Sequence, residues 1–171
     1  MVSRRQAREW AVMMLCECDL NPPESLDAAL AAFWEQQADI ERERLDAKEF
    51  GVKRAFATKN DRERAALEEM KAFAEARVRG VMGTREALDA ALEPLLKHWD
   101  LYRLGTIERN VLRLGAWEIL NAPGIPAPIA INEAVDLAKF YSETQSGRFV
   151  NAVLDRFAKT VAERPFTPGE A

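Results

Sequence analysis

Residues 107–120 read IERNVLRLGAWEIL, with apolar side chains on nearly every side of a helix. Gly105 and Thr106 come just before this segment and mark its start. A helix that is apolar nearly all round is buried in the interior of a protein. We therefore expect residues 107–120 to form a central helix, with the other segments packed around it.

Amphipathic segments lie before and after this central segment. Ser3, with Gln6 three residues later, has the spacing of a helix cap, and apolar side chains then recur on one helical face until Pro22 follows Asn21. A first helix is therefore expected from Ser3 to about Asn21, because a residue before proline disfavours helical dihedral angles. Similar spacing predicts helices that start at Ser25, after Asp61, after Thr84 as a cap, at Asn132 as a cap, and at Ser146.

Prolines are expected to interrupt this series of helices. Pro94 removes a backbone donor, so the helix after Thr84 should kink or split near Glu93. The prolines in residues 123–128 predict a stiff loop. The chain contains no pair of alternating apolar and polar runs joined by a hairpin turn. The expected fold is therefore all-α, a single-domain helical bundle of about seven helices.

The composition fits one compact domain. Of the 171 residues, 48% are hydrophobic and 30% are charged, and a chain of this length buries enough surface to need neither disulfides nor a structural metal. We expect the domain to span residues 1–164, with a charged, insertion-like segment at about residues 40–79. The tail at residues 165–171 is expected to fray.

The net charge and the two cysteines indicate which partners and which cellular compartment to expect. Twenty-eight acidic residues against 24 Lys and Arg give a net charge of -4, so any polyanion site must be a local patch. Cys16 and Cys18 are two residues apart on one helix and point in different directions, so we expect reduced thiols. No secretory signal and no run of roughly 20 apolar residues is evident. The expectation is a soluble, cytoplasmic protein without membrane contact.

Catalytic chemistry has little support in the residues. His98 is the only histidine, and it either favours the dipole at a helix end or serves catalysis. One histidine and two divergent cysteines cannot assemble a zinc site. Residues 80–83 lack the strand and the Lys-Ser/Thr of a phosphate loop. We therefore expect no enzyme activity and no cofactor.

Three arginines crowd the start of the first helix. Arg4, Arg5 and Arg8 are expected on its exposed side, where cations oppose the positive end of the helix dipole. Such a placement favours an anionic partner, and the planar guanidinium suits phosphate oxygens and base stacking in single-stranded RNA. The competing interpretation is a solvated helix face on which Arg8 pairs with nearby acids.

Four blocks of sequence occur in a fixed order. They are RRQARE at residues 4–9, IERNVLRLGAWEIL at residues 107–120, AINEAVDLAK at residues 130–139 and SGRFVNAVLD at residues 146–155. In content and order these blocks, which cover about half of the chain, resemble the NusB transcription antitermination factor family. The resemblance implies a non-catalytic, all-helical protein that binds boxA-type single-stranded RNA together with NusE, a small-subunit ribosomal protein. It also implies a role in helping transcribing RNA polymerase resist termination.

The resemblance also implies site residues. Glu108 is expected to contact NusE, although an acid in the first helical turn also simply favours the dipole. Phe149 is expected near the RNA, although it also fits the apolar stripe of its own helix. Gln145 stands where relatives often carry an acid, and Cys16 and Cys18 stand where they often carry aromatics. The RNA-binding positions implied are Arg4, Arg5, Arg8, Gln145, Arg148 and Phe149.

Two other functions stay open as hypotheses. NusB-like domains also precede the catalytic domain of some ribosomal RNA methyltransferases, so this chain could recruit RNA for an RNA-modifying enzyme acting in trans. The third hypothesis is a homodimeric protein-interaction scaffold that hides its arginines. Binding of RNA with and without NusE separates the first function from the other two.

Overall fold

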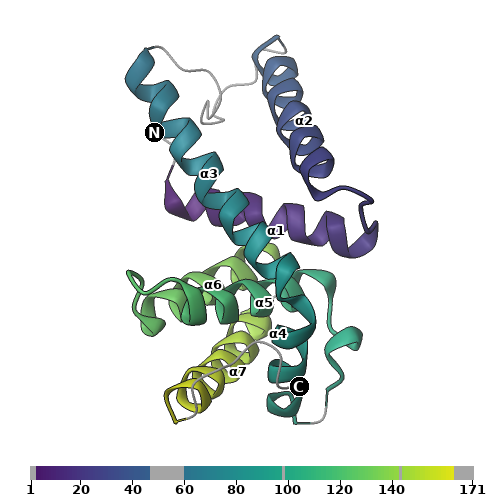
Figure 1. Cartoon of the computed structure of the whole chain (residues 1–171), viewed down its shortest axis with the longest axis vertical. Helices are drawn as coiled ribbons and strands as arrows, with labels where there is room; N and C mark the ends of the chain where they lie inside the picture. The colour runs from purple at the N-terminus through teal and green to yellow at the C-terminus, as the bar shows by residue number, and fades with distance from the viewer. Residues whose placement is uncertain (1–2, 47–59, 98, 143, 164–171) are drawn as a thin grey trace. The chain divides into compact units, whose positions relative to one another are not determined.

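A computed structural model describes residues 3–46, 60–97, 99–142 and 144–163 (Figure 1). Within these ranges the chain forms seven α-helices and two short 3₁₀ turns, with no strand, which confirms the all-α fold class. None of the described helices has the length and apolar character needed to cross a membrane. The elements are α1 (Arg4–Leu20), α2 (Leu26–Asp46), α3 (Asp61–Gly83), α4 (Arg85–Leu92), η1 (Glu93–Leu95), η2 (Leu101–Arg103), α5 (Thr106–Asn121), α6 (Ala127–Tyr141) and α7 (Thr144–Glu163).

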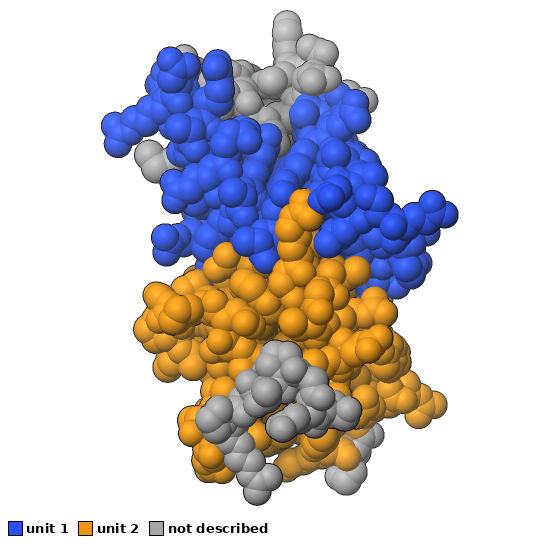
Figure 2. Space-filling model, in the orientation of Figure 1, with its two compact units in different colours: residues 1–76 blue, residues 77–171 orange. Residues whose placement is uncertain are grey.

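The chain divides into two compact units, coloured separately in Figure 2. The first unit is Met1–Ala76 and the second is Arg77–Ala171, so the boundary falls within α3. A single domain over residues 1–164 stays a prediction. Residues 47–59, His98 and the tail from residue 164 lie outside the described residues, and so do the expectations made for them.

Aromatic side chains hold the first unit together. Trp10 of α1 and Trp34 of α2 meet edge to face, with ring centroids 5.3 Å apart. The indole Nε1 of Trp34 donates a 2.7 Å hydrogen bond to Oε1 of Glu75 on α3. Edge-to-face aromatic pairs add stability beyond the area they bury. One tryptophan therefore ties α2 to both of its neighbours in this unit.

In the second unit α5 takes the central position that its sequence predicts. It packs against α4, α6 and α7, and residues 111–116 are all buried. Unexpectedly, four polar side chains of α5 are buried as well: Arg109, Asn110, Arg113 and Glu118.

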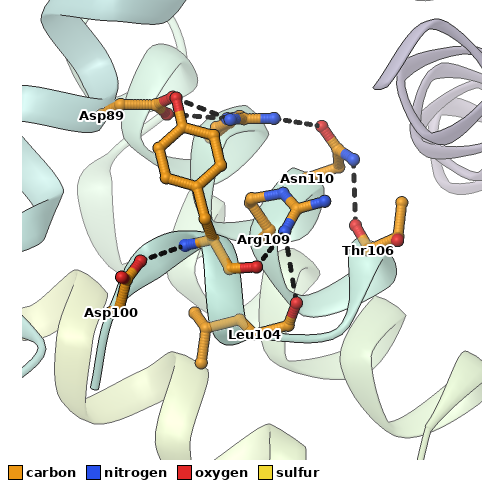
Figure 3. Close-up of polar contacts among 8 residues, drawn as sticks. Asp89, Asp100, Leu104, Thr106, Arg109 and Asn110 are labelled. Atoms are coloured by element: carbon orange, nitrogen blue, oxygen red, sulfur yellow. Dashed lines mark hydrogen bonds and ion pairs between the residues drawn. The ribbon is translucent and has the colours of Figure 1, made fainter. Parts of the chain in front are cut away.

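The buried polar groups are arranged in pairs and networks (Figure 3). Arg113 donates from Nε and Nη2 to the two carboxylate oxygens of Asp89 on α4, both at 2.7 Å. Tyr102 of η2 donates its hydroxyl to the same carboxylate at 3.1 Å, while Arg109 donates to the backbone carbonyl of Leu104. Buried charges are tolerated when they are paired in this way. The network fastens η2 to the two helices α4 and α5.

Several predicted boundaries are confirmed. The Ser3 hydroxyl accepts a hydrogen bond from the backbone N–H of Gln6, and α1 ends at Leu20 with Asn21 as its C-cap. Ser25 precedes α2 and accepts from the backbone N–H of Ala28. The helix after Thr84 breaks at Glu93, where η1 replaces α-helical geometry around Pro94. Cys16 and Cys18 are free thiols.

Two predicted helix starts and one predicted helix cap are wrong in detail. The helix expected from Asn132 begins five residues earlier, at Ala127, because Pro128 lies in the first turn, where no backbone donor is required. The last helix begins at Thr144 rather than Ser146. Thr84 precedes α4, but its hydroxyl donates backwards to the carbonyl of Gly80 at 2.8 Å and caps nothing.

Candidate nucleic-acid interface

Two cationic side chains, Arg4 and Arg5, lie at the start of α1. The Ser3 cap starts the helix at Arg4, which places Arg4 and Arg5 among the first helical residues. The first turn contains no acidic residue. Exposed backbone N–H groups at a helix start already carry partial positive charge, so the two guanidinium groups strengthen a positive potential there. This end of α1 is suited to an anion.

Arg4 and Arg8 lie one helical turn apart and share a single aromatic neighbour. Their guanidinium carbons are 5.7 Å and 5.4 Å from the ring centroid of Phe73 on α3. Arg4 is exposed, whereas Arg8 is only 4% exposed. The expectation that Arg8 lies on the exposed side of the helix is therefore wrong, because the α1 face that carries it is packed against Phe73.

Arg5 takes part in a surface ion pair. Its Nε lies 3.5 Å from Oε1 of Glu9, one turn further along α1. An arginine that precedes its acid by four residues is the less favourable order on a helix, and partly exposed pairs contribute little stability. Arg5 therefore has an acidic neighbour on α1, while the pairing of Arg8 with nearby acids stays an open interpretation.

The second group of predicted RNA contacts lies at the start of α7, in the second unit. Gln145 and Arg148 are exposed. Phe149 is half-buried, which suits both core packing and contact with a base, so its two interpretations stay open. The RNA-contact roles of these residues and of the α1 arginines stay predictions, and the two groups belong to different units.

Glu108 holds together elements of its own unit. Its Oε1 accepts a 2.9 Å hydrogen bond from the hydroxyl of Ser146 on α7, and its carboxylate also accepts from the hydroxyl of Ser142 at the end of α6. The side chain turns back over Gly105, where a Cβ atom would overlap its carboxylate. The predicted contact of Glu108 with NusE stays a prediction, and any such contact must share the carboxylate with these serines.

The environment of Glu108 lowers the pKa of its carboxyl group. Partial burial acts to raise this pKa, but hydrogen bonds from Ser142, from the Glu108 backbone N–H and from Ser146 outweigh it and lower the pKa below its ordinary value. A group whose pKa is lower in the folded state stabilises the fold above its unfolded-state pKa. That stabilisation is lost as the pH falls through the folded-state pKa.

Glu108→Gln should therefore destabilise the protein in a pH-dependent way. At neutral pH we expect a loss of about 1 kcal/mol in the free energy of unfolding, because two hydrogen bonds to a half-buried charge become neutral ones. The difference from wild type should shrink as the pH falls through the folded-state pKa, because the wild-type carboxylate then becomes protonated. Urea unfolding at several pH values measures this. A difference independent of pH would contradict the assignment.

Two side chains that contact the predicted site residues, Phe73 and Ser142, could not be found from the sequence. Phe73 is part of an ordinary apolar stripe in its helix, so its position beside Arg4 and Arg8 has no local signal. Ser142 lies at a helix end, and only the meeting of α5 with α6 and α7 brings it to Glu108. Among the described residues, no group of three or more His, Cys, Asp or Glu side chains is placed to hold a metal ion.

Comparisons with known proteins agree on one family. Among solved structures, T. maritima NusB has a similar fold. It matches this chain with a TM-score of 0.69 at 27% identity, over 92% of each chain. A chain in a crystal structure of antitermination factors NusB and NusE in complex with dsRNA matches with a TM-score of 0.62 at 26% identity, over 92% of this chain and 96% of that one.

Sequence comparison then assigns the chain itself. It is 37% identical over 159 residues to the transcription antitermination protein NusB of Anaeromyxobacter dehalogenans (strain 2CP-1), covering 92% of both chains. The NusB family model matches residues 5–159. The chain belongs to the NusB family.

Proposed function

We propose that this protein is a non-catalytic transcription antitermination factor that binds boxA-type single-stranded RNA together with NusE. Its binding to RNA and NusE would help transcribing RNA polymerase resist termination in the cytoplasm. The observation that carries the proposal is the family match over residues 5–159. One of the similar solved structures contains NusB and NusE in complex with dsRNA, which supports NusE and RNA as joint partners.

The start of α1 supplies the chemistry for RNA binding. Arg4 is exposed, and Arg5 is half-buried, with its Nε 3.5 Å from Oε1 of Glu9. Each guanidinium offers five N–H donors in a planar fork that matches phosphate oxygens, and its plane stacks on bases. Because the protein has a net charge of -4, this local patch must overcome an unfavourable overall field.

The function is tested by fluorescence anisotropy with a labelled boxA-like RNA. We expect purified NusE to tighten binding of the single-stranded RNA, and we expect a scrambled RNA of equal length to gain less. A duplex of the same sequence tests whether single strands are preferred. If NusE leaves the affinity for every RNA unchanged, or if the protein binds no RNA, the proposed function is wrong.

The α1 arginines should carry a measurable part of this affinity. In Arg4→Ala/Arg5→Ala we expect RNA binding to weaken by about tenfold or more. The plot of log K against log salt should flatten by about 1.4, since each single-strand phosphate contact contributes about 0.7 to the slope. Because phosphate contacts carry no sequence information, the loss should be similar for boxA-like and scrambled RNA.

A matched control removes the same charge from the same unit. Arg62 and Arg64 are exposed in the first turn of α3, so Arg62→Ala/Arg64→Ala also lowers the net charge by two. We expect this variant to change the affinity by less than about threefold, as rim charges act mainly through long-range attraction. Equal losses in the two double variants would show that overall charge, rather than the α1 patch, governs binding.

A further inference from the structure

We propose that Phe73 is a positioning residue for RNA binding, whose ring holds the guanidinium of Arg4 in place with the help of the buried Arg8. This inference rests on the proposed function, and it adds a residue of α3 to the arginine patch at the start of α1. Phe73 itself needs no contact with the RNA.

The geometry of the three side chains carries the first step. Arg4 and Arg8 are one turn apart on α1, and both guanidinium carbons lie within 6 Å of the Phe73 centroid, at 5.7 Å and 5.4 Å. Like charges four residues apart on a helix repel each other. The negative face of an aromatic ring attracts cations at this distance. The ring therefore allows two positive groups to stay close together.

Burial separates the roles of the two arginines. Arg8 is 4% exposed, whereas Arg4 is exposed and Phe73 is half-buried. A buried guanidinium cannot reach a phosphate in solution, so Arg8 acts by packing α1 and Phe73 against each other. Arg4 is the cation of this pair that a ligand can reach.

Contact with a ring prepares Arg4 for a phosphate. A cation–π contact occupies no hydrogen-bond acceptor, so the N–H groups of Arg4 keep their capacity to bind phosphate oxygens. A long arginine side chain otherwise loses much rotamer freedom when a ligand fixes it. Holding the side chain beforehand reduces that loss on binding, which is the general benefit of preorganisation.

Phe73→Leu tests the proposal because it keeps apolar bulk and removes the ring. We expect its affinity for single-stranded boxA-like RNA to fall by about three- to tenfold, the range that corresponds to one cation–π contact. The salt slope should fall by up to about 0.7, as one phosphate contact is weakened. Phe73→Tyr keeps the ring and should bind within about twofold of wild type. A purely structural role would leave the salt slope unchanged.

The control for losing an exposed aromatic ring is Phe140→Leu. Phe140 is 65% exposed on α6, in the second unit, and its ring meets that of Tyr141 edge to face. We expect its RNA affinity and salt slope to match wild type. If Phe73→Leu also matches wild type while wild type binds RNA, the positioning role is wrong and the proposed function stands. If wild type binds no RNA, the proposed function fails.

A second measurement needs neither RNA nor a folded variant. In the NMR spectrum of the wild-type protein, the ring current of Phe73 should shift the side-chain Nε–H resonances of Arg4 and Arg8 away from those of Arg62 and Arg64. The absence of such shifts would overturn the proposal even if Phe73→Leu fails to fold. Their presence, with a loss of affinity in Phe73→Leu and recovery in Phe73→Tyr, would support it.

Discussion

Asp89→Ala should lower the free energy of unfolding by about 3–5 kcal/mol, the usual cost of removing one partner from a buried ion pair. The side chain of Arg113 is 1% exposed and donates a 2.7 Å hydrogen bond to each carboxylate oxygen of Asp89. Without Asp89 its charge would stay in the interior with far weaker compensation. Urea unfolding followed by circular dichroism gives the change in midpoint and in slope.

Two further variants show whether the charge pair is responsible for this loss. Tyr102→Phe removes only the hydroxyl that donates to Asp89, from a residue that is 62% exposed, and should cost about 1 kcal/mol or less. Asp89→Leu/Arg113→Met removes both charges and should be more stable than Asp89→Ala. A loss below about 1 kcal/mol in Asp89→Ala would mean that the pair contributes little to the fold.

Gly80→Ala should destabilise the protein by about 2 kcal/mol, although helix propensity alone predicts the opposite sign. Alanine in a helix interior is favoured over glycine by about 1 kcal/mol. A Cβ atom on Gly80 of α3, however, would overlap the indole ring of Trp117 on α5. A flat ring cannot bend away as a flexible chain end does, so the two helices must move apart, and overpacking of this kind costs about 1–3 kcal/mol or more.

Gly83→Ala is the matched control, since it lies in the same helix and makes the same chemical change. No atom of a neighbouring element lies within 4 Å of the position its Cβ would take. We expect it to be neutral or to stabilise the protein by up to about 1 kcal/mol. Thermal unfolding of both variants measures the difference. If Gly80→Ala is as stable as Gly83→Ala, close packing of α3 on Trp117 does not limit stability.

Helix positions could be predicted because they depend on neighbours in sequence. The Ser3 cap, the end of α1 before Pro22 and the break at Pro94 all follow from hydrogen bonds within a few residues. The start of α6 does not follow from the prolines of residues 123–128, because proline occurs both in loops and in the first turn of a helix.

The site was predicted only in part. The basic start of α1 is visible in the sequence, and Arg4 is exposed as expected. The burial of Arg8 was not expected, because the partner ring of Phe73 comes from another helix. For Glu108 the sequence predicts a partner contact or a favourable interaction with the helix dipole. It cannot predict the hydrogen bond with Ser146, because these residues are 38 positions apart in the chain. The sequence does contain a signal for the buried network. Charged residues within the mostly apolar α5 segment are expected to be buried, and buried charges require partners.

Spacing along the chain was sufficient to establish an all-helical protein, its central helix α5 and its basic first helix, because helix periodicity and capping are properties of short segments. Spacing could not identify Asp89 as the partner of Arg113, Phe73 as the neighbour of two arginines, or Ser142 and Ser146 as donors to Glu108. Those pairings bring together groups from different helices, and their energies depend on distance and burial in three dimensions.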